Sequence, residues 1–206
     1  LIRQLLSEIL SSNPQIEVVG TAQDPYVASE KIRKLKPDVV TLDVDMSRMD
    51  SLSFLRRLLR SRPLPVVMVS SMTDAAAELT LQALELGAVD YISKPGRNRQ
   101  QELMGCASEI INKVKSAALA RVQKADPALA KSIGTAELGA AKPIKHSNMI
   151  IAIGASTGGT EALKDILCQS PSCTPAMLIT QHIPAAFSKP FAERLNASSA
   201  MTITQA

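Results

Sequence analysis

The chain has 206 residues, of which 46% are hydrophobic, 2% aromatic and 20% charged, and its formal net charge is +4. This composition favours aliphatic cores, as in parallel sheets covered by helices, and argues against a disordered chain. The basic residues are scattered rather than clustered, so we expect no nucleic-acid partner.

The cysteine count and the hydropathy pattern bear on metal binding, cellular compartment and membrane insertion. Three cysteines without a C-x-x-C pair and two histidines make no zinc-ligand set. An odd cysteine count without a disulfide framework favours a reducing, cytoplasmic compartment. No apolar run approaches the ~20 residues needed for direct membrane insertion.

Helical and strand patterns alternate through the first half of the chain. We expect helices at Ile2–Leu10, Pro25–Leu35, Leu52–Leu59, Ala75–Leu86 and Gln100–Val122, and strands at Ile16–Val19, Val39–Val44, Val66–Ser70 and Val89–Ser93. Asp24 is the expected N-cap of the second helix, and Gly87 is expected to close the fourth. The short loops predict a doubly wound parallel α/β sheet. Because such a fold normally begins with a strand, we expect its first strand to be missing.

An Ala- and Lys-rich stretch at 116–147 is predicted to be a linker, after which the alternation restarts. We expect strands at Met149–Ile153, Ala176–Thr180 and Met201–Thr204, and helices at Thr160–Leu167 and Ala186–Leu195. The predicted domains are therefore 1–115, a linker, and 148–206 as the start of a second parallel α/β domain. About 60 residues are too few to close such a domain.

Polar residues stand at or near the ends of three successive strands of the first domain. They are Asp43, Ser70 and Lys94. Ligands of open parallel sheets bind at the carboxyl ends of the strands, so we expect these side chains to converge. A carboxylate, a hydroxyl and an ammonium group suit phosphoryl transfer to the carboxylate with Mg²⁺. The alternative is that Asp43 caps the next helix and Lys94 is solvated.

A second candidate site begins at Gly154-Ala155-Ser156-Thr157-Gly158-Gly159, which matches the G-x-S-x-G nucleophile elbow. Its glycines permit a sharp strand-to-helix turn, and the helix amides would stabilise an oxyanion. A phosphate-binding glycine turn shares this backbone pattern. His182 follows the next strand, which favours a Ser156 nucleophile with a His182 base.

Three segments of the first domain resemble response-regulator receiver domains, and most closely the receiver of the chemotaxis protein-glutamate methylesterases. They are Leu42–Met46, Val66–Ser71 and Ala83–Pro95. The resemblance implies a flavodoxin-like fold with Asp43 as the phosphorylated residue, Ser70 and Tyr91 as a switch pair, and Lys94 touching the phosphoryl group. It also implies a cis Lys94–Pro95 bond. Mg²⁺ would bind through Asp43 and an acidic pair on the missing first strand.

Two later segments, Ile151–Leu163 and Gln181–Asn196, are similar to the methylesterase domain of the same family. This resemblance implies hydrolysis of glutamyl methyl esters and deamidation of glutamines on chemoreceptor cytoplasmic domains, with no cofactor for the hydrolysis. Ser156 would be the nucleophile and His182 the base, and a chemotaxis histidine kinase would be the phosphodonor. The family's catalytic Asp falls about a hundred residues later. We therefore expect little esterase activity from these 206 residues alone.

Two other functions compete with this interpretation. A transcriptional regulator would carry a helix-turn-helix after the linker, where this chain instead has a glycine-rich strand-turn-helix. A non-catalytic phospho-switch that binds partners without turnover remains open as the second hypothesis.

Overall fold

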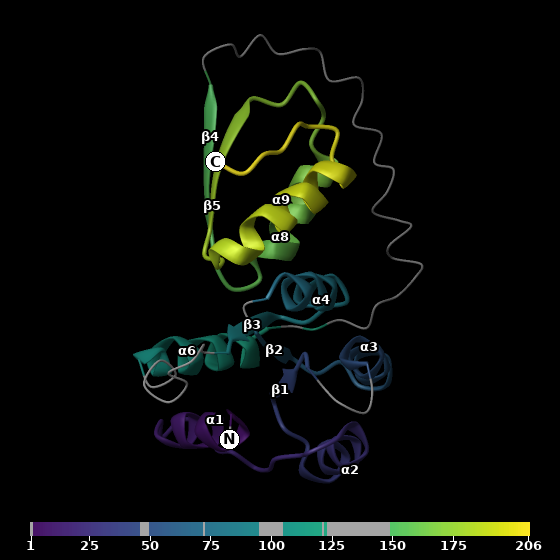
Figure 1. Cartoon of the computed structure of the whole chain (residues 1–206), viewed down its shortest axis with the longest axis vertical. Coiled ribbons are helices and arrows are strands. Elements are labelled where there is room, and N and C mark those ends of the chain that lie inside the picture. Colours follow the sequence, from purple (N-terminus) through teal and green to yellow (C-terminus); the bar gives the residue numbers. More distant parts are fainter. Residues whose placement is uncertain (1, 46–49, 72, 95–104, 121, 123–148) are drawn as a thin grey trace. The chain divides into compact units, whose positions relative to one another are not determined.

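The computed structural model describes residues 2–45, 50–71, 73–94, 105–120, 122 and 149–206 (Figure 1). The chain divides into two compact units, residues 1–123 and 124–206. Both are α/β, as the alternating patterns predict, and each is described by itself.

The first unit is built on a parallel three-stranded sheet. Its strands are β1 (Val40–Asp43), β2 (Val66–Ser70) and β3 (Asp90–Ser93), in the order β1-β2-β3. Every residue of the central strand β2 is buried. Such a continuous apolar run is typical of a strand covered on both faces, and this burial fixes the sheet as the core of the unit.

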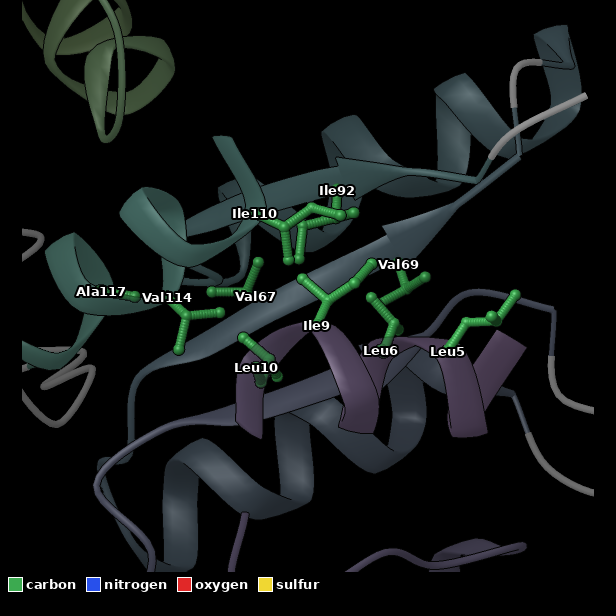
Figure 2. Close-up of a cluster of buried hydrophobic side chains, with 10 residues drawn as sticks. All are labelled: Leu5, Leu6, Ile9, Leu10, Val67, Val69, Ile92, Ile110, Val114 and Ala117. Carbon is green, nitrogen blue, oxygen red and sulfur yellow. The ribbon is translucent and has the colours of Figure 1, made fainter. Parts of the chain in front are cut away.

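Helices α1 (Ile2–Ser11) and α6 (Ala107–Ala118) pack against one face of this sheet (Figure 2). Their apolar side chains meet the same face of β2 and β3 in one cluster of Leu5, Leu6, Ile9, Leu10, Val67, Val69, Ile92, Ile110, Val114 and Ala117. The other face of β2 contacts α4 (Asp74–Glu85), which packs beside α3 (Ser51–Ser61). The sheet is therefore wound on both sides, as expected.

The helix boundaries follow from local chemistry. The carboxylate of Asp24 accepts hydrogen bonds from two backbone amides at the start of α2 (Pro25–Leu35), which confirms the predicted N-cap. Gly87 follows α4 with φ of +110°, and an added Cβ would lie 3.3 Å from Leu59 Cδ1. A residue with a side chain would be strained there, so glycine closes the helix as predicted.

The second unit pairs β4 (Ile150–Ala155) with β5 (Ala176–Gln181) in parallel. Helices α8 (Gly159–Gln169) and α9 (Ala185–Ser198) supply the buried leucines that pack on one face of these strands. Both strands alternate between exposed and half-buried residues. On the other face, Ile150 and Leu178 are each 65% exposed.

Two strand predictions are wrong. Residues 16–19 and 201–204 form no strand. Ile16 and Val18 pack against the first core, and Met201 and Ile203 pack against the second. The alternating pattern identifies the inward side chains, but a strand also needs a hydrogen-bonded neighbour, and no described strand pairs with either segment.

The last helix of the first unit also differs from its prediction. Helix α6 ends at Ala118 rather than Val122, and it includes residues 116–118, which were predicted to be linker. The start of the predicted helix, at 100–104, lies outside the described residues, as does most of the predicted linker. Pro95 is also outside them, so the predicted cis Lys94–Pro95 bond remains a prediction.

Candidate functional sites

The first site joins the ends of β1 and β3. The ammonium of Lys94 lies 2.5 Å from Asp43 Oδ1 and 3.1 Å from Asp45 Oδ2. The Lys94 side chain is 11% exposed and that of Asp43 is 39% exposed. One partly buried cation therefore links two carboxylates, and the Asp43 carboxylate remains open to solvent on one side.

The backbone explains why Lys94 reaches Asp43. Ser70 pairs with Ser93 across β2 and β3, and the Lys94 amide donates to the Ser70 carbonyl at 2.6 Å. The alternative role of Asp43 as a helix cap is wrong, because Asp50 caps α3 by accepting the Leu52 amide. Asp43 instead accepts the Asp45 amide at 2.8 Å.

Ser70 lies at the predicted strand end, but its hydroxyl faces another partner. The hydroxyl accepts a hydrogen bond from Thr80 of α4 at 2.7 Å and lies 3.3 Å from the Ala76 carbonyl. Ser70 and Thr80 are both fully buried. Asp43 pairs in register with Val69, one residue before Ser70. Successive strand residues point to opposite faces, so Ser70 turns toward α4 rather than toward the carboxylate.

Tyr91 on β3 is buried, and Lys113 of α6 holds it from one side. The Lys113 ammonium lies 4.6 Å from the centroid of the Tyr91 ring and donates to the Tyr91 carbonyl at 2.8 Å. It also pairs with Asp90 at 3.3 Å and with Glu109 at 3.5 Å. Burial raises the pKa of the Tyr91 hydroxyl, and the negative charges of Asp90 and Glu109 raise it further.

The donor set bears on the predicted Mg²⁺. Carboxylate oxygens are the ligands that Mg²⁺ prefers, and it commonly takes one or two of them from a protein together with phosphate oxygens. Asp43 and Asp45 supply two such groups. No cluster of three or more acidic, histidine or cysteine ligands occurs among the described residues. The residues present therefore fit a partial magnesium site.

The second site lies at the ends of β4 and β5. Ala155 pairs with Gln181, and the His182 amide donates to the Ala155 carbonyl at 3.0 Å. Ser156 follows Ala155, so the candidate nucleophile and base stand beside each other on parallel, adjacent strands. Both residues are exposed. In this part of the described structure no hydrogen bond joins the Ser156 hydroxyl to the His182 ring, which is common for catalytic pairs before substrate binds.

The Gln181 side chain ties the two strand ends together. Its amide nitrogen donates to the Ser156 carbonyl at 3.0 Å and to the His182 carbonyl at 3.4 Å. Its amide oxygen is buried against Gly159, where an added Cβ would overlap that oxygen and lie 2.7 Å from the Ala155 Cβ. Only glycine fits at position 159.

The remaining turn residues adopt the expected tight geometry. Gly158 has φ of +74° and precedes α8, and the Gly159 amide closes the turn on the Ser156 carbonyl at 2.8 Å. Gly154 is the penultimate residue of β4, and Thr157 is exposed between the nucleophile and the helix. The positive end of α8 thus begins next to Ser156, where it favours an anion.

Sequence reasoning missed three residues of these sites, namely Thr80, Lys113 and Gln181. Thr80 and Lys113 lie on the buried faces of their helices, four residues after Ala76 and three after Ile110. A polar residue in such an apolar stripe is the signal that could have found them. For Gln181 a signal existed, because it is a polar residue in the last, inward-facing position of a strand that enters a candidate site.

Comparisons with known proteins find relatives of both units. Residues 1–105 match the family model of the response regulator receiver domain, and residues 151–206 match that of the CheB methylesterase. A crystal structure of the response regulator domain of Thermotoga maritima CheB is 37% identical, with a TM-score of 0.53, over 58% of this chain and 90% of that one.

Curated relatives extend the similarity along the whole chain. A protein-glutamate methylesterase/protein-glutamine glutaminase of Xanthomonas campestris is 52% identical over 100% of this chain and 59% of its own length. One from Hydrogenovibrio crunogenus is 45% identical over 100% of this chain and 62% of its own. The chain therefore spans about three fifths of the length of these relatives.

Proposed function

The chain belongs to the response regulator receiver family through residues 1–105, and from this premise we propose that it acts in a phosphorylation-controlled hydrolase of glutamyl methyl esters on chemoreceptors. The same site would deamidate receptor glutamines, and the protein would work in the cytoplasm. The observation that carries the proposal is the register of β4 and β5, which sets Ser156 beside His182 at the start of a glycine turn. No helix in the described ranges is long and apolar enough to span a membrane.

The proposed reaction is acyl transfer through Ser156. Its Oγ attacks the ester carbonyl carbon while the His182 ring accepts the hydroxyl proton. The tetrahedral oxyanion forms near the N-terminus of α8, where backbone amides and the helix dipole stabilise negative charge. The acyl–oxygen bond then breaks, and methanol leaves with the proton from His182. Water attacks the acyl-enzyme by the same proton path and releases glutamate and free Ser156. With a glutamine substrate the leaving group is ammonia.

The first unit would control this reaction through Asp43. A chemotaxis histidine kinase would supply the phosphoryl group, which forms a bond to an Asp43 carboxylate oxygen. The phosphoryl dianion would attract Lys94 away from its contact with Asp45. Ser70 and Tyr91, as a switch pair, would change their side-chain orientations in response to the new charge. Phosphorylation of Asp43 would raise the reactivity of Ser156. Mg²⁺, held through Asp43 with Asp45 nearby, would neutralise phosphoryl oxygens during the transfer.

A second candidate function is a phospho-switch that binds partners without turnover. It is favoured by one observation, which is that the His182 ring has no hydrogen-bond partner among the described residues. Serine hydrolases orient this ring with an acid, and replacing that acid lowers kcat by ~10⁴-fold. We therefore expect slow ester hydrolysis from these 206 residues.

Covalent labelling of the nucleophile separates the two functions, because it needs one attack rather than full turnover. The chain is incubated with a fluorophosphonate probe, and the labelled peptide is identified by mass spectrometry. We expect the label on Ser156, its loss in Ser156→Ala and a slower reaction in His182→Ala, with Ser188→Ala as the control that reacts normally. An unlabelled Ser156, under conditions in which the Xanthomonas relative is labelled, contradicts the hydrolase.

A further inference from the structure

The first unit buries a charged side chain that the proposed phosphoryl site does not use. Lys113 points inward from α6, and its side chain is 11% exposed. Asp90, its ion-pair partner at the start of β3, is 8% exposed. Burying two charges is costly, and well-packed apolar residues often serve stability as well or better. Stability alone therefore does not explain why this pair is here.

The geometry of Lys113 is directed at Tyr91. The ammonium group lies over the face of the Tyr91 ring, 4.6 Å from its centroid, and at the same time donates a hydrogen bond to the Tyr91 carbonyl at 2.8 Å. A cation over a ring face is attracted by the ring quadrupole, and the attraction is strongest in a desolvated setting. Asp90 and Glu109 hold the ammonium in place at 3.3 and 3.5 Å.

We infer that Lys113 is a positioning residue of the switch: its ammonium holds the Tyr91 ring in the buried orientation. The ring leaves that orientation only by giving up the cation contact, so the strength of this contact sets how readily Tyr91 turns. The switch role of Tyr91 rests on the proposed function, whereas the restraint by Lys113 rests on the geometry alone.

The chain contains its own reference for a test. It has two tyrosines, and Tyr26 is 72% exposed whereas Tyr91 is 3% exposed. With 3-fluorotyrosine incorporated into the 206-residue chain, ¹⁹F NMR gives one buried and one exposed resonance, and Tyr91→Phe assigns them. The readouts are the Tyr91 chemical shift and its change between H₂O and D₂O.

Four variants separate ring positioning from general packing. In Lys113→Met we expect the Tyr91 resonance to move toward that of Tyr26 and to gain solvent sensitivity, and in Lys113→Arg we expect it to stay. Lys115→Met is the matched control on the same helix, since Lys115 is exposed and bonds Gln15 at 2.5 Å. Because Lys113→Met leaves Asp90 buried without its cation, the double variant with Asp90→Asn removes both charges.

The double variant decides the case if Lys113→Met alone unfolds. A folded double variant with an exposed Tyr91 resonance supports positioning. A folded double variant whose Tyr91 resonance matches the parent chain overturns the inference and leaves Lys113 a structural residue. Acetyl phosphate with Mg²⁺ tests the underlying function separately. If the Tyr91 resonance of the parent chain does not change with this phosphodonor, the switch proposal fails. The restraint of the ring by Lys113 is still decided by the resonances of the variants.

Discussion

The two candidate sites occupy the same kind of place, the carboxyl ends of adjacent parallel strands, but they are assembled differently. At the first, side chains already hold one another, since Lys94 bridges Asp43 and Asp45. At the second, the backbone and Gln181 align the strand ends, while the Ser156 hydroxyl and the His182 ring remain unbonded to each other. The proposed phosphoryl acceptor is thus already paired with a cation, whereas the candidate nucleophile is exposed.

The sheets that carry the two sites also differ in how deeply their strands are buried. Strand β2 is buried along its whole length, whereas β4 and β5 expose every second residue. The first site therefore lies on a sheet whose central strand is packed on both faces. The second rests on a sheet with one open face in the described structure.

The largest expected effect on stability comes from truncating a buried side chain of β2, compared with an exposed one of β5. Met68 is fully buried in β2, and Met68→Ala is expected to lower the free energy of unfolding of the first unit by about 2–5 kcal/mol, because it leaves a cavity. Leu178→Ala, at an exposed position of β5, is expected to change stability by less than about 0.5 kcal/mol. Hydrogen exchange measured peptide by peptide reports each unit separately. Equal losses from the two substitutions would show that β5 is as tightly packed as β2.

A smaller effect is expected from crowding the nucleophile turn. In Gly159→Ala the new Cβ collides with the Gln181 amide and Ala155, which should cost about 1–3 kcal/mol in the second unit and slow the labelling of Ser156. Gly154→Ala is the control, since nothing lies within 4 Å of its added Cβ. Both are measured by urea unfolding and by the labelling rate. Unchanged labelling in Gly159→Ala would mean that Gln181 does not align the turn.

Releasing Ser70 should have a modest effect on stability. Thr80→Val keeps the side-chain shape but removes the hydroxyl that donates to Ser70, at a cost of about 1 kcal/mol. Because the Ser70 hydroxyl then keeps only its contacts with the Ser71 and Ala76 carbonyls, we expect its side chain to change rotamer more readily and the phosphorylated state to live longer or form faster with acetyl phosphate. Ser29→Ala, which removes a similar bond to a carbonyl four residues back in α2, should leave phosphorylation unchanged. Identical kinetics in the two variants would rule out a restraint by Thr80.

The smallest effect is a pH dependence carried by Tyr91. Its pKa is raised in the folded state by burial and by Asp90 and Glu109. Folding thus favours the protonated hydroxyl, and its contribution is fully present below the ordinary tyrosine pKa of about 10 and is lost as the pH rises above it. Urea midpoints across this range should fall more steeply in the parent chain than in Tyr91→Phe. Parallel curves would show that the hydroxyl titrates freely in the folded state.

Most of the fold follows from the sequence, because the burial of one or both faces of an element sets the spacing of its apolar residues along the chain. The helical spacing of α1 and the unbroken apolar run of β2 reflect how many faces each element buries. The failed strands at 16–19 and 201–204 carry the correct inward residues. Strand pairing depends on a neighbour elsewhere in the chain, which a local pattern does not encode.

The side-chain contacts of the sites are only partly predictable from local sequence patterns. Asp43 and Lys94 meet as predicted from their strand ends. Ser70 does not, because a register difference of one residue sends its hydroxyl to the opposite face. Lys113 is 22 residues from Tyr91 along the chain, and only the packing of α6 on β3 brings the two together.

The most direct test of the account is whether phosphorylation at Asp43 changes the reactivity of Ser156. The rate of fluorophosphonate labelling at Ser156 is measured with and without acetyl phosphate and Mg²⁺, in the parent chain and in Asp43→Asn. We predict faster labelling with the phosphodonor in the parent chain and no change in Asp43→Asn. Equal rates in a parent chain that mass spectrometry shows to be phosphorylated on Asp43 would contradict phosphorylation control of the hydrolase site.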